Sequence, residues 1–243
     1  MLNKMQTVQK SISLPIKAYN VTEVKDIFPI LELIQFCNNL ITCNCWNSIY
    51  TESSRMDLAN IGQIRGRNID IICENCNINY KIEYKYELDN SFSLKEFYEF
   101  ILTSLLEKYY NYNGVPDYML FNKECLKFLK ILKSLEKIYK VNFIETWYSY
   151  IEEFCNIFYK ASELNEKDLS QYKLLLRFLT YLPEEDFQIY KNIHTNEKIF
   201  NYILFVRNKA LKNIIKIINS FYFLKYQILN NIAPLYGAFF MEI

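Results

Sequence analysis

The sequence predicts a mixed α/β core followed by an all-helical C-terminal extension. Two neighbouring segments alternate apolar and polar residues, which is the period of half-buried strands. Apolar residues recur at helical spacing before and after these segments, and beyond residue 147 helical spacing is the only pattern. We therefore expect a flexible or extended N-terminus over 1–20, an α/β core over 21–150 and a helical region over 151–243.

The core is expected to begin with a helix over 21–40. Thr22 and Asp26 are residue types that cap helix N-termini. The apolar stripe of this helix comprises Ile27, Ile30, Leu31, Leu33 and Ile34. Residues 42–50 are predicted as a strand, and the polar, glycine-containing stretch 51–66 as a loop.

Two further strands are predicted over 67–73 and 78–87, joined by a short polar turn as a hairpin. If Asp70 lies opposite Glu83, alternation places Asp70, Glu83 and Lys85 on one face of the sheet. Two carboxylates beside a lysine favour a site for a divalent metal and a water molecule. Alternatively, this is an ordinary amphipathic sheet with a solvated, ion-paired face.

Helical spacing predicts the remaining helices, and the polar segment before residue 94 supplies a cap for the first of them. These helices cover 94–110, 123–139, 147–160, 168–181, 184–193 and 197–231. Local alternation predicts two short strands, over 117–121 and 140–146. The expected order is thus a helix, three strands, a helix, a strand, a helix, a strand and a helical tail.

The composition of the chain limits the classes of function that it can have. The 243-residue chain has a formal net charge of +1, so any affinity for nucleic acid must come from local charge. We find no signal peptide and no run long enough to span a bilayer, and we expect no membrane partner. Seven cysteines without a disulfide-scaffold pattern predict a reducing intracellular setting, the cytoplasm or a host nucleus. The single histidine, His194, excludes hydrolases that need a histidine pair.

The element order, Asp70 and the run Glu83-Tyr84-Lys85 resemble the PD-(D/E)XK nuclease superfamily. In that superfamily an aspartate at the end of the second strand precedes an acidic-x-Lys motif on the third. The interval from Asp70 to Glu83 resembles that of archaeal Holliday-junction resolvases, and residues 62–70 look like the matching segment of RecB-like nucleases. The resemblance implies a restriction-endonuclease-like mixed sheet flanked by helices.

The resemblance also implies a metal-dependent phosphodiesterase that cleaves DNA or RNA. The abundance of Ile, Asn, Lys and Tyr, which is typical of an AT-rich genome, fits a virus, plasmid or mobile-element setting. Asp70, Glu83 and the backbone carbonyl of Tyr84 would bind Mg²⁺ or Mn²⁺, and Glu32 would complete the metal shell. Lys85 would position or deprotonate the attacking water. Resolvase-like members act as dimers, so a homodimer is implied too. The alternative is a catalytically inactive nuclease-like fold that serves as a protein-interaction or immunity factor, with a protein partner.

Basic side chains near the proposed site and in the last helix are candidate contacts for the phosphate backbone. They are Arg65, Arg67, Lys81, Lys209, Lys212 and Lys216. The last three share one face of the predicted helix 197–231, which either grips nucleic acid or is simply solvated.

Cysteines form two close pairs, Cys43-x-Cys45 and Cys73-x-x-Cys76. Together they could supply four thiolates to a zinc ion, and the second pair flanks the predicted hairpin turn as in a zinc knuckle. Alternatively, these cysteines bind no metal and act as small apolar side chains.

Overall fold

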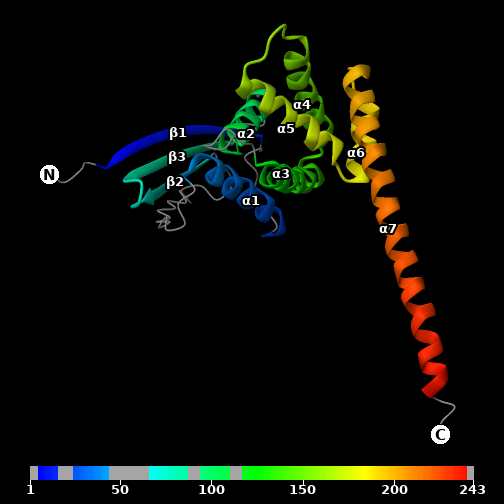
Figure 1. Ribbon diagram of the computed structural model, residues 1–243. Helices are drawn as coiled ribbons and strands as arrows, with labels where there is room; N and C mark the ends of the chain where they lie inside the picture. The colour runs from blue at the N-terminus through cyan, green and yellow to red at the C-terminus, as the bar shows by residue number, and fades with distance from the viewer. Residues whose placement is uncertain (1–4, 16–23, 44–65, 87–93, 110–116, 240–243) are drawn as a thin grey trace.

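The computed structural model describes residues 5–15, 24–43, 66–86, 94–109 and 117–239. Within these ranges the chain forms a three-stranded mixed sheet and seven helices (Figure 1). The predicted mixture of helices and sheet is confirmed, with helices dominating. The predicted loop over 51–66 and nearly all of the predicted strand over 42–50 lie outside the described ranges.

The sheet has the strand order β1-β3-β2. The predicted hairpin is present as β2 (Gly66–Cys73) and β3 (Ile78–Tyr86), which pair antiparallel. The third strand, β1 (Gln6–Leu14), pairs parallel with β3. This strand comes from the N-terminal segment that the sequence patterns left outside the core.

One face of the sheet is apolar and buried because every second residue of each strand points to the same side. Its buried residues are Ile12, Leu14, Ile69, Ile71, Tyr80, Ile82 and Tyr84. Helix α1 (Val24–Ile41) contacts this face through buried Tyr84, whose hydroxyl lies within hydrogen-bond distance of Ile34 and Asn38. The Tyr84 hydroxyl donates a 2.6 Å hydrogen bond to Asn38 Oδ1 of α1. The opposite face carries the polar residues of the strands.

The strands predicted over 117–121 and 140–146 are wrong. Asp117 instead caps α3 (Tyr118–Tyr139) by accepting a hydrogen bond from the Leu120 amide. Lys140 ends α3 in the left-handed conformation, and Asn142 caps α4 (Phe143–Lys160). Residues 140–142 thus form a tight link between two helices, and the local alternation there reflects this link.

Aromatic side chains join four helices into one core. Trp147 of α4 contacts Tyr98 of α2 (Leu94–Tyr109) and Phe128 of α3, with ring centroids 5.3 and 5.0 Å apart. Phe128 also stacks on Phe36 of α1 at 5.2 Å. Helix α1 contacts the sheet, and α3 and α4 contact the helices that follow. The aromatic cluster therefore connects the sheet to the helical region.

The remaining helices are α5 (Glu166–Thr180), α6 (Glu184–Ile193) and α7 (Glu197–Phe239). The start of α7 is fixed by Glu152 of α4, whose carboxylate accepts hydrogen bonds from the backbone amides of Thr195 and Asn196 at 2.8 and 3.2 Å. From there α7 runs past α5 and α6 and then extends far beyond the rest of the molecule (Figure 1).

Candidate functional site

The polar face of the hairpin brings together most of the residues predicted as catalytic. β2 contributes Asp70, and β3 contributes Lys81, Glu83 and Lys85. Asp70 is half-buried, whereas the three β3 residues are exposed. The resulting surface is a stripe of alternating charge on the side of the sheet away from α1.

The pairing register differs from the one predicted. Asp70 lies opposite Lys81, and Glu83 lies opposite Asn68. The predicted register is therefore wrong by two residues. A shift of two preserves the side on which each residue lies, so Asp70 and Glu83 still share a face as diagonal neighbours. Lys81 becomes the residue directly across from Asp70.

Glu83 is held by two neighbours on the exposed face. The Ser11 hydroxyl of β1 donates a 3.2 Å hydrogen bond to Glu83 Oε2. Lys85 Nζ lies 3.8 Å from the same oxygen, and both side chains are about half exposed, at 47 % and 53 %. An exposed pair of this kind contributes little to stability, about 0–1 kcal/mol. Both groups can therefore leave this contact for a ligand at little cost.

Ser11 is the residue of this face that the sequence patterns missed. Its signal was the alternation of Ser11 and Ser13 with buried Ile12 and Leu14. This pattern marks a half-buried strand but does not say which strand it joins.

Glu32, predicted as a further metal ligand, is not brought to the two carboxylates. It is an exposed residue of α1, and α1 lies on the apolar face. The Tyr84 carbonyl belongs to the central strand, between Ile12 of β1 and Arg67 of β2. Of the predicted oxygen ligands, Asp70 and Glu83 are the carboxylates on the polar face.

The predicted basic residues are spread over the molecule. Arg65 lies outside the described residues, and Arg67 occupies the position of β2 opposite Tyr84. Lys81 lies on the polar face. The exposed lysines of α7, at 209, 212 and 216, belong to a helix on the far side of the molecule from the sheet (Figure 1). Among the basic side chains of this set that the structure describes, Lys81 lies beside the carboxylates.

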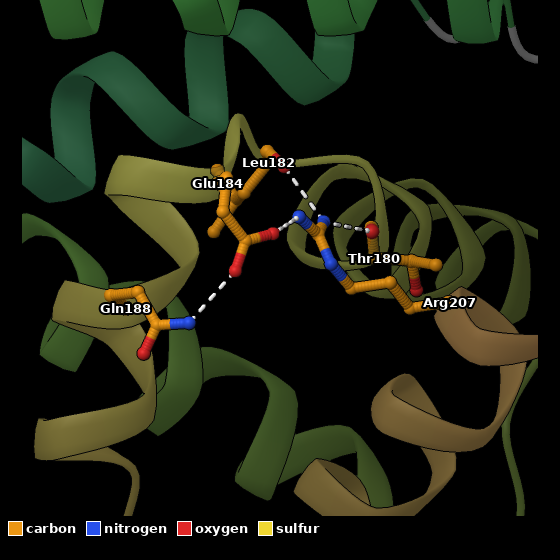
Figure 2. Close-up of polar contacts among 5 residues, drawn as sticks. All are labelled: Thr180, Leu182, Glu184, Gln188 and Arg207. Atoms are coloured by element: carbon orange, nitrogen blue, oxygen red, sulfur yellow. Dashed lines mark hydrogen bonds and ion pairs between the residues drawn. The ribbon is translucent and has the colours of Figure 1, made fainter. Parts of the chain in front are cut away.

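Arg207, also in α7, stabilises the fold. Its guanidinium donates hydrogen bonds to the carbonyl oxygens of Thr180 and Leu182 at 3.0 and 2.7 Å, and to Glu184 at 2.7 Å (Figure 2). It also lies over the ring of Phe187 at 4.3 Å. These contacts fasten α7 to the turn between α5 and α6.

The cysteine pairs are partly brought together. The sulfur atoms of Cys43, Cys73 and Cys76 all lie within 4.8 Å of one another. Cys45 lies outside the described residues, so its part in this group stays a prediction. Next to the group, burial and the adjacent thiol of Cys43 raise the pKa of Tyr80 to about 12.

The two groups suit different metals. The carboxylates of the polar face are hard oxygen donors of the kind that Mg²⁺ and Mn²⁺ prefer. The thiols are soft donors that favour zinc. The oxygen donors therefore lie on the polar face of the sheet, and the sulfur donors form a separate group.

Comparisons with known proteins add no relative. No family model, no curated protein and no solved structure matches the chain. Within the described ranges, none of the helices combines the length and the apolar character required to cross a bilayer.

Proposed function

We propose that the protein is a metal-dependent phosphodiesterase that cleaves nucleic acid with Asp70, Glu83 and Lys85. The observation that carries the proposal is their position on one exposed face of two paired strands. The order of Asp70 before Glu83-Tyr84-Lys85 on two successive strands also resembles the motif order of PD-(D/E)XK nucleases, which supports the proposal. Its exposed face leaves room for an extended polyanion.

Each residue has a distinct part in this proposal. Asp70 and Glu83 supply oxygen ligands, and Ser11 orients Glu83 through its 3.2 Å hydrogen bond. Lys85 exchanges its contact with Glu83 for the attacking water or a phosphate oxygen. Lys81 places positive charge next to Asp70 and attracts the phosphate backbone. A bound Mg²⁺ or Mn²⁺ would polarise the scissile phosphate and acidify a water molecule.

Glu32 has no part in the proposed site because α1 lies behind the sheet. The metal shell is instead completed by water and substrate oxygens, which is common for Mg²⁺.

A cleavage assay tests the proposal. Labelled single-stranded and duplex DNA and RNA are incubated with the protein and Mn²⁺, and with EDTA as the metal-free control. We expect Asp70→Asn and Lys85→Ala each to lower the rate at least 100-fold. Glu99→Gln on α2 and Lys10→Ala on β1 change exposed charges elsewhere and should cleave like wild type. Cleavage that survives Asp70→Asn, or wild type that cuts no substrate, would refute the proposal.

A second candidate function, self-association through α7, is favoured by a different observation. The helix continues as far as Phe239, and its apolar side chains between 211 and 221 are 45–68 % exposed. They are Leu211, Ile214, Ile215, Ile217, Ile218 and Phe221. Large exposed apolar patches of this kind mark interaction surfaces. We infer that a second copy of the chain covers them.

The spacing of this face supports a coiled coil. Leu211, Ile214, Ile218 and Phe221 are separated by three, four and three residues, which is the seam of a heptad repeat. The lysines at 209, 212 and 216 lie on the other side of the helix, so two copies can meet without opposing charges. The self-association would make the protein an interaction module through this helix.

Sedimentation velocity over a range of concentrations tests this second candidate. We expect a dimer for the wild type and a monomer for Ile218→Asp. Asn213→Asp adds the same charge to the polar side of the helix and should remain dimeric. A wild type that stays monomeric, or one that binds anionic lipid vesicles as a monomer instead, would contradict it.

A further inference from the structure

Three cysteines from two parts of the chain meet at one end of the sheet. Cys43 follows the C-terminal end of α1, Cys73 is the last residue of β2, and Cys76 lies in the turn that follows. Their sulfur atoms are all within 4.8 Å of one another. Cys73 is buried, Cys43 is half-buried and Cys76 is exposed. The cluster therefore has one side in the protein and one side open to ligand entry.

The spacing of the sulfurs is close to that of a zinc site. With a Zn–S bond of about 2.3 Å and tetrahedral angles, ligand sulfurs lie about 3.8 Å apart. The three sulfurs, all within 4.8 Å of one another, are therefore about 1 Å or less from the separation that an ion would require.

The hairpin turn is shaped to present two of the sulfurs. Asn77 adopts a positive φ of 54°, a conformation that asparagine tolerates better than most residues. The Asn77 amide donates a 3.1 Å hydrogen bond to the Glu74 carbonyl, and the Gln6 amide of β1 donates a 2.9 Å bond to the Asn77 carbonyl. The turn is thereby closed on itself and fastened to β1, and it holds Cys76 next to Cys73.

We propose that Cys43, Cys73 and Cys76 bind a Zn²⁺ ion, with a water molecule as its fourth ligand, and that the ion ties the C-terminal end of α1 to the tip of the β2–β3 hairpin. Thiolates are the ligands of structural zinc sites. The ion would fix α1 against the sheet and so hold the hairpin that carries the polar face. The proposal stands on the sulfur positions and is independent of any nuclease activity.

The other buried cysteines of the described ranges make suitable controls. Cys37, Cys125 and Cys155 are completely buried, and burial raises the pKa of each thiol. Unlike Cys73, which is also buried, none of the three belongs to the group of sulfurs within 4.8 Å of one another, and a thiol held protonated in an apolar core is a poor metal ligand. These cysteines should therefore make no contribution to metal binding.

The test measures metal on the full-length protein without nucleic acid. Protein purified with a thiol reductant is analysed for zinc by mass spectrometry, and after Co²⁺ exchange its absorption spectrum is recorded. We expect one equivalent of zinc per chain and a sulfur-to-cobalt charge-transfer band. Cys76→Ser, which changes an exposed residue, should lose the zinc and weaken the band, whereas Cys155→Ala should retain both.

A second measurement uses only the wild type, so it does not depend on the folding of a variant. Removal of zinc with a chelator should lower the melting temperature, and added Zn²⁺ should restore it, because metal that binds the folded state stabilises it. A wild type that carries no zinc and shows no cobalt–thiolate band after reconstitution would overturn the proposal. So would Cys76→Ser protein with a full equivalent of zinc.

Discussion

The hydroxyl of Tyr84 donates a 2.6 Å hydrogen bond to Oδ1 of Asn38 and thereby joins the central strand β3 to helix α1. Tyr84 stands between Glu83 and Lys85, which point to the opposite side of the sheet. Three consecutive residues thus serve two purposes: the middle one fixes the strand to the core, and its neighbours form the exposed charged face. A change at Tyr84 should therefore alter stability without altering the charge of that face.

Tyr84→Phe should lower the free energy of unfolding by about 1–3 kcal/mol, because it leaves the buried Asn38 oxygen without this donor. Urea denaturation followed by circular dichroism measures the loss. Tyr159→Phe removes a hydroxyl from an exposed tyrosine of α4 and should change stability little. Equal effects of the two substitutions would show that the hydrogen bond to Asn38 is unimportant.

Lys81→Ala should weaken binding of nucleic acid to the charged face. One lost phosphate contact lowers the slope of log K against log salt by about 1. Fluorescence anisotropy with a labelled oligonucleotide over a range of salt concentrations gives that slope. Lys10→Ala removes another exposed lysine, at the β1 position opposite buried Ile82, and should leave the slope unchanged. An unchanged slope for Lys81→Ala would remove this lysine from the interface.

Arg207→Ala should release α7 from the turn between α5 and α6. The carbonyls of Thr180 and Leu182 lose their guanidinium donor, and we expect a destabilisation of about 1.5–3 kcal/mol. Amide hydrogen exchange should show faster exchange at the end of α5 and over the α7 residues around 207. Lys209→Ala, two residues along the same helix and exposed, is the matched control. Similar exchange in both variants would contradict the anchoring role.

The contact between Arg207 and Glu184 also predicts a pH dependence. The hydrogen bond from Arg207 is the main cause that lowers the pKa of the Glu184 carboxyl below its usual 4.5. Because the folded-state pKa is the lower one, the contact stabilises the fold above pH 4.5 and is lost as the pH falls through the folded-state value. The stability difference between wild type and Glu184→Gln should thus be constant near neutral pH and shrink below about pH 4.5. A difference that grows on acidification would reverse this sign.

Glu152→Ala should destabilise the protein strongly. Glu152 is only 1 % exposed, and its carboxylate accepts hydrogen bonds from the two amides that precede α7. A hydrogen bond to a charged group contributes about 1.5–3 kcal/mol to the free energy of unfolding. The substitution also removes the negative charge next to the positive end of the α7 helix dipole. Chemical denaturation provides the measurement.

The adjacent Glu153 is the control for this substitution. It forms a 2.6 Å ion pair with Lys95, but its side chain is 52 % exposed. Glu153→Ala should therefore cost only about 0–1 kcal/mol. If Glu153→Ala destabilises the protein as much as Glu152→Ala does, burial of the carboxylate is not what makes Glu152 important.

The hairpin could be predicted because its signal is local. Alternation over 66–73 and 78–86 marks both strands, and the polar residues 74–77 mark the turn. Alternation also fixes which residues share a face. It does not fix the register, because a shift of two residues leaves every side chain on the same face. The closing pair at the turn, Cys73 with Ile78, sets the register and places Lys81 opposite Asp70.

Other features could not be predicted because they depend on distant parts of the chain. The pairing of β1 with β3 brings Ser11 to Glu83, which is 72 residues away in the sequence. A local pattern does not identify so distant a pairing partner. The false strand over 140–146 arose from alternation across a junction between helices. There Phe143, Trp147 and Ile151 are buried at helical spacing, a longer pattern that outweighs the short one.

The parallel pairing of β1 has a consequence for how the protein is made. Of the three strands of this sheet, β1 is synthesised before β2 and β3, and it cannot complete its pairing until its partner β3, which ends at Tyr86, has emerged. Such non-local pairing closes a long loop and is slow compared with helix formation. During synthesis Ile12 and Leu14, which are buried in the fold, therefore stay exposed until β3 has emerged, and in that interval β1 is open to capture by a chaperone.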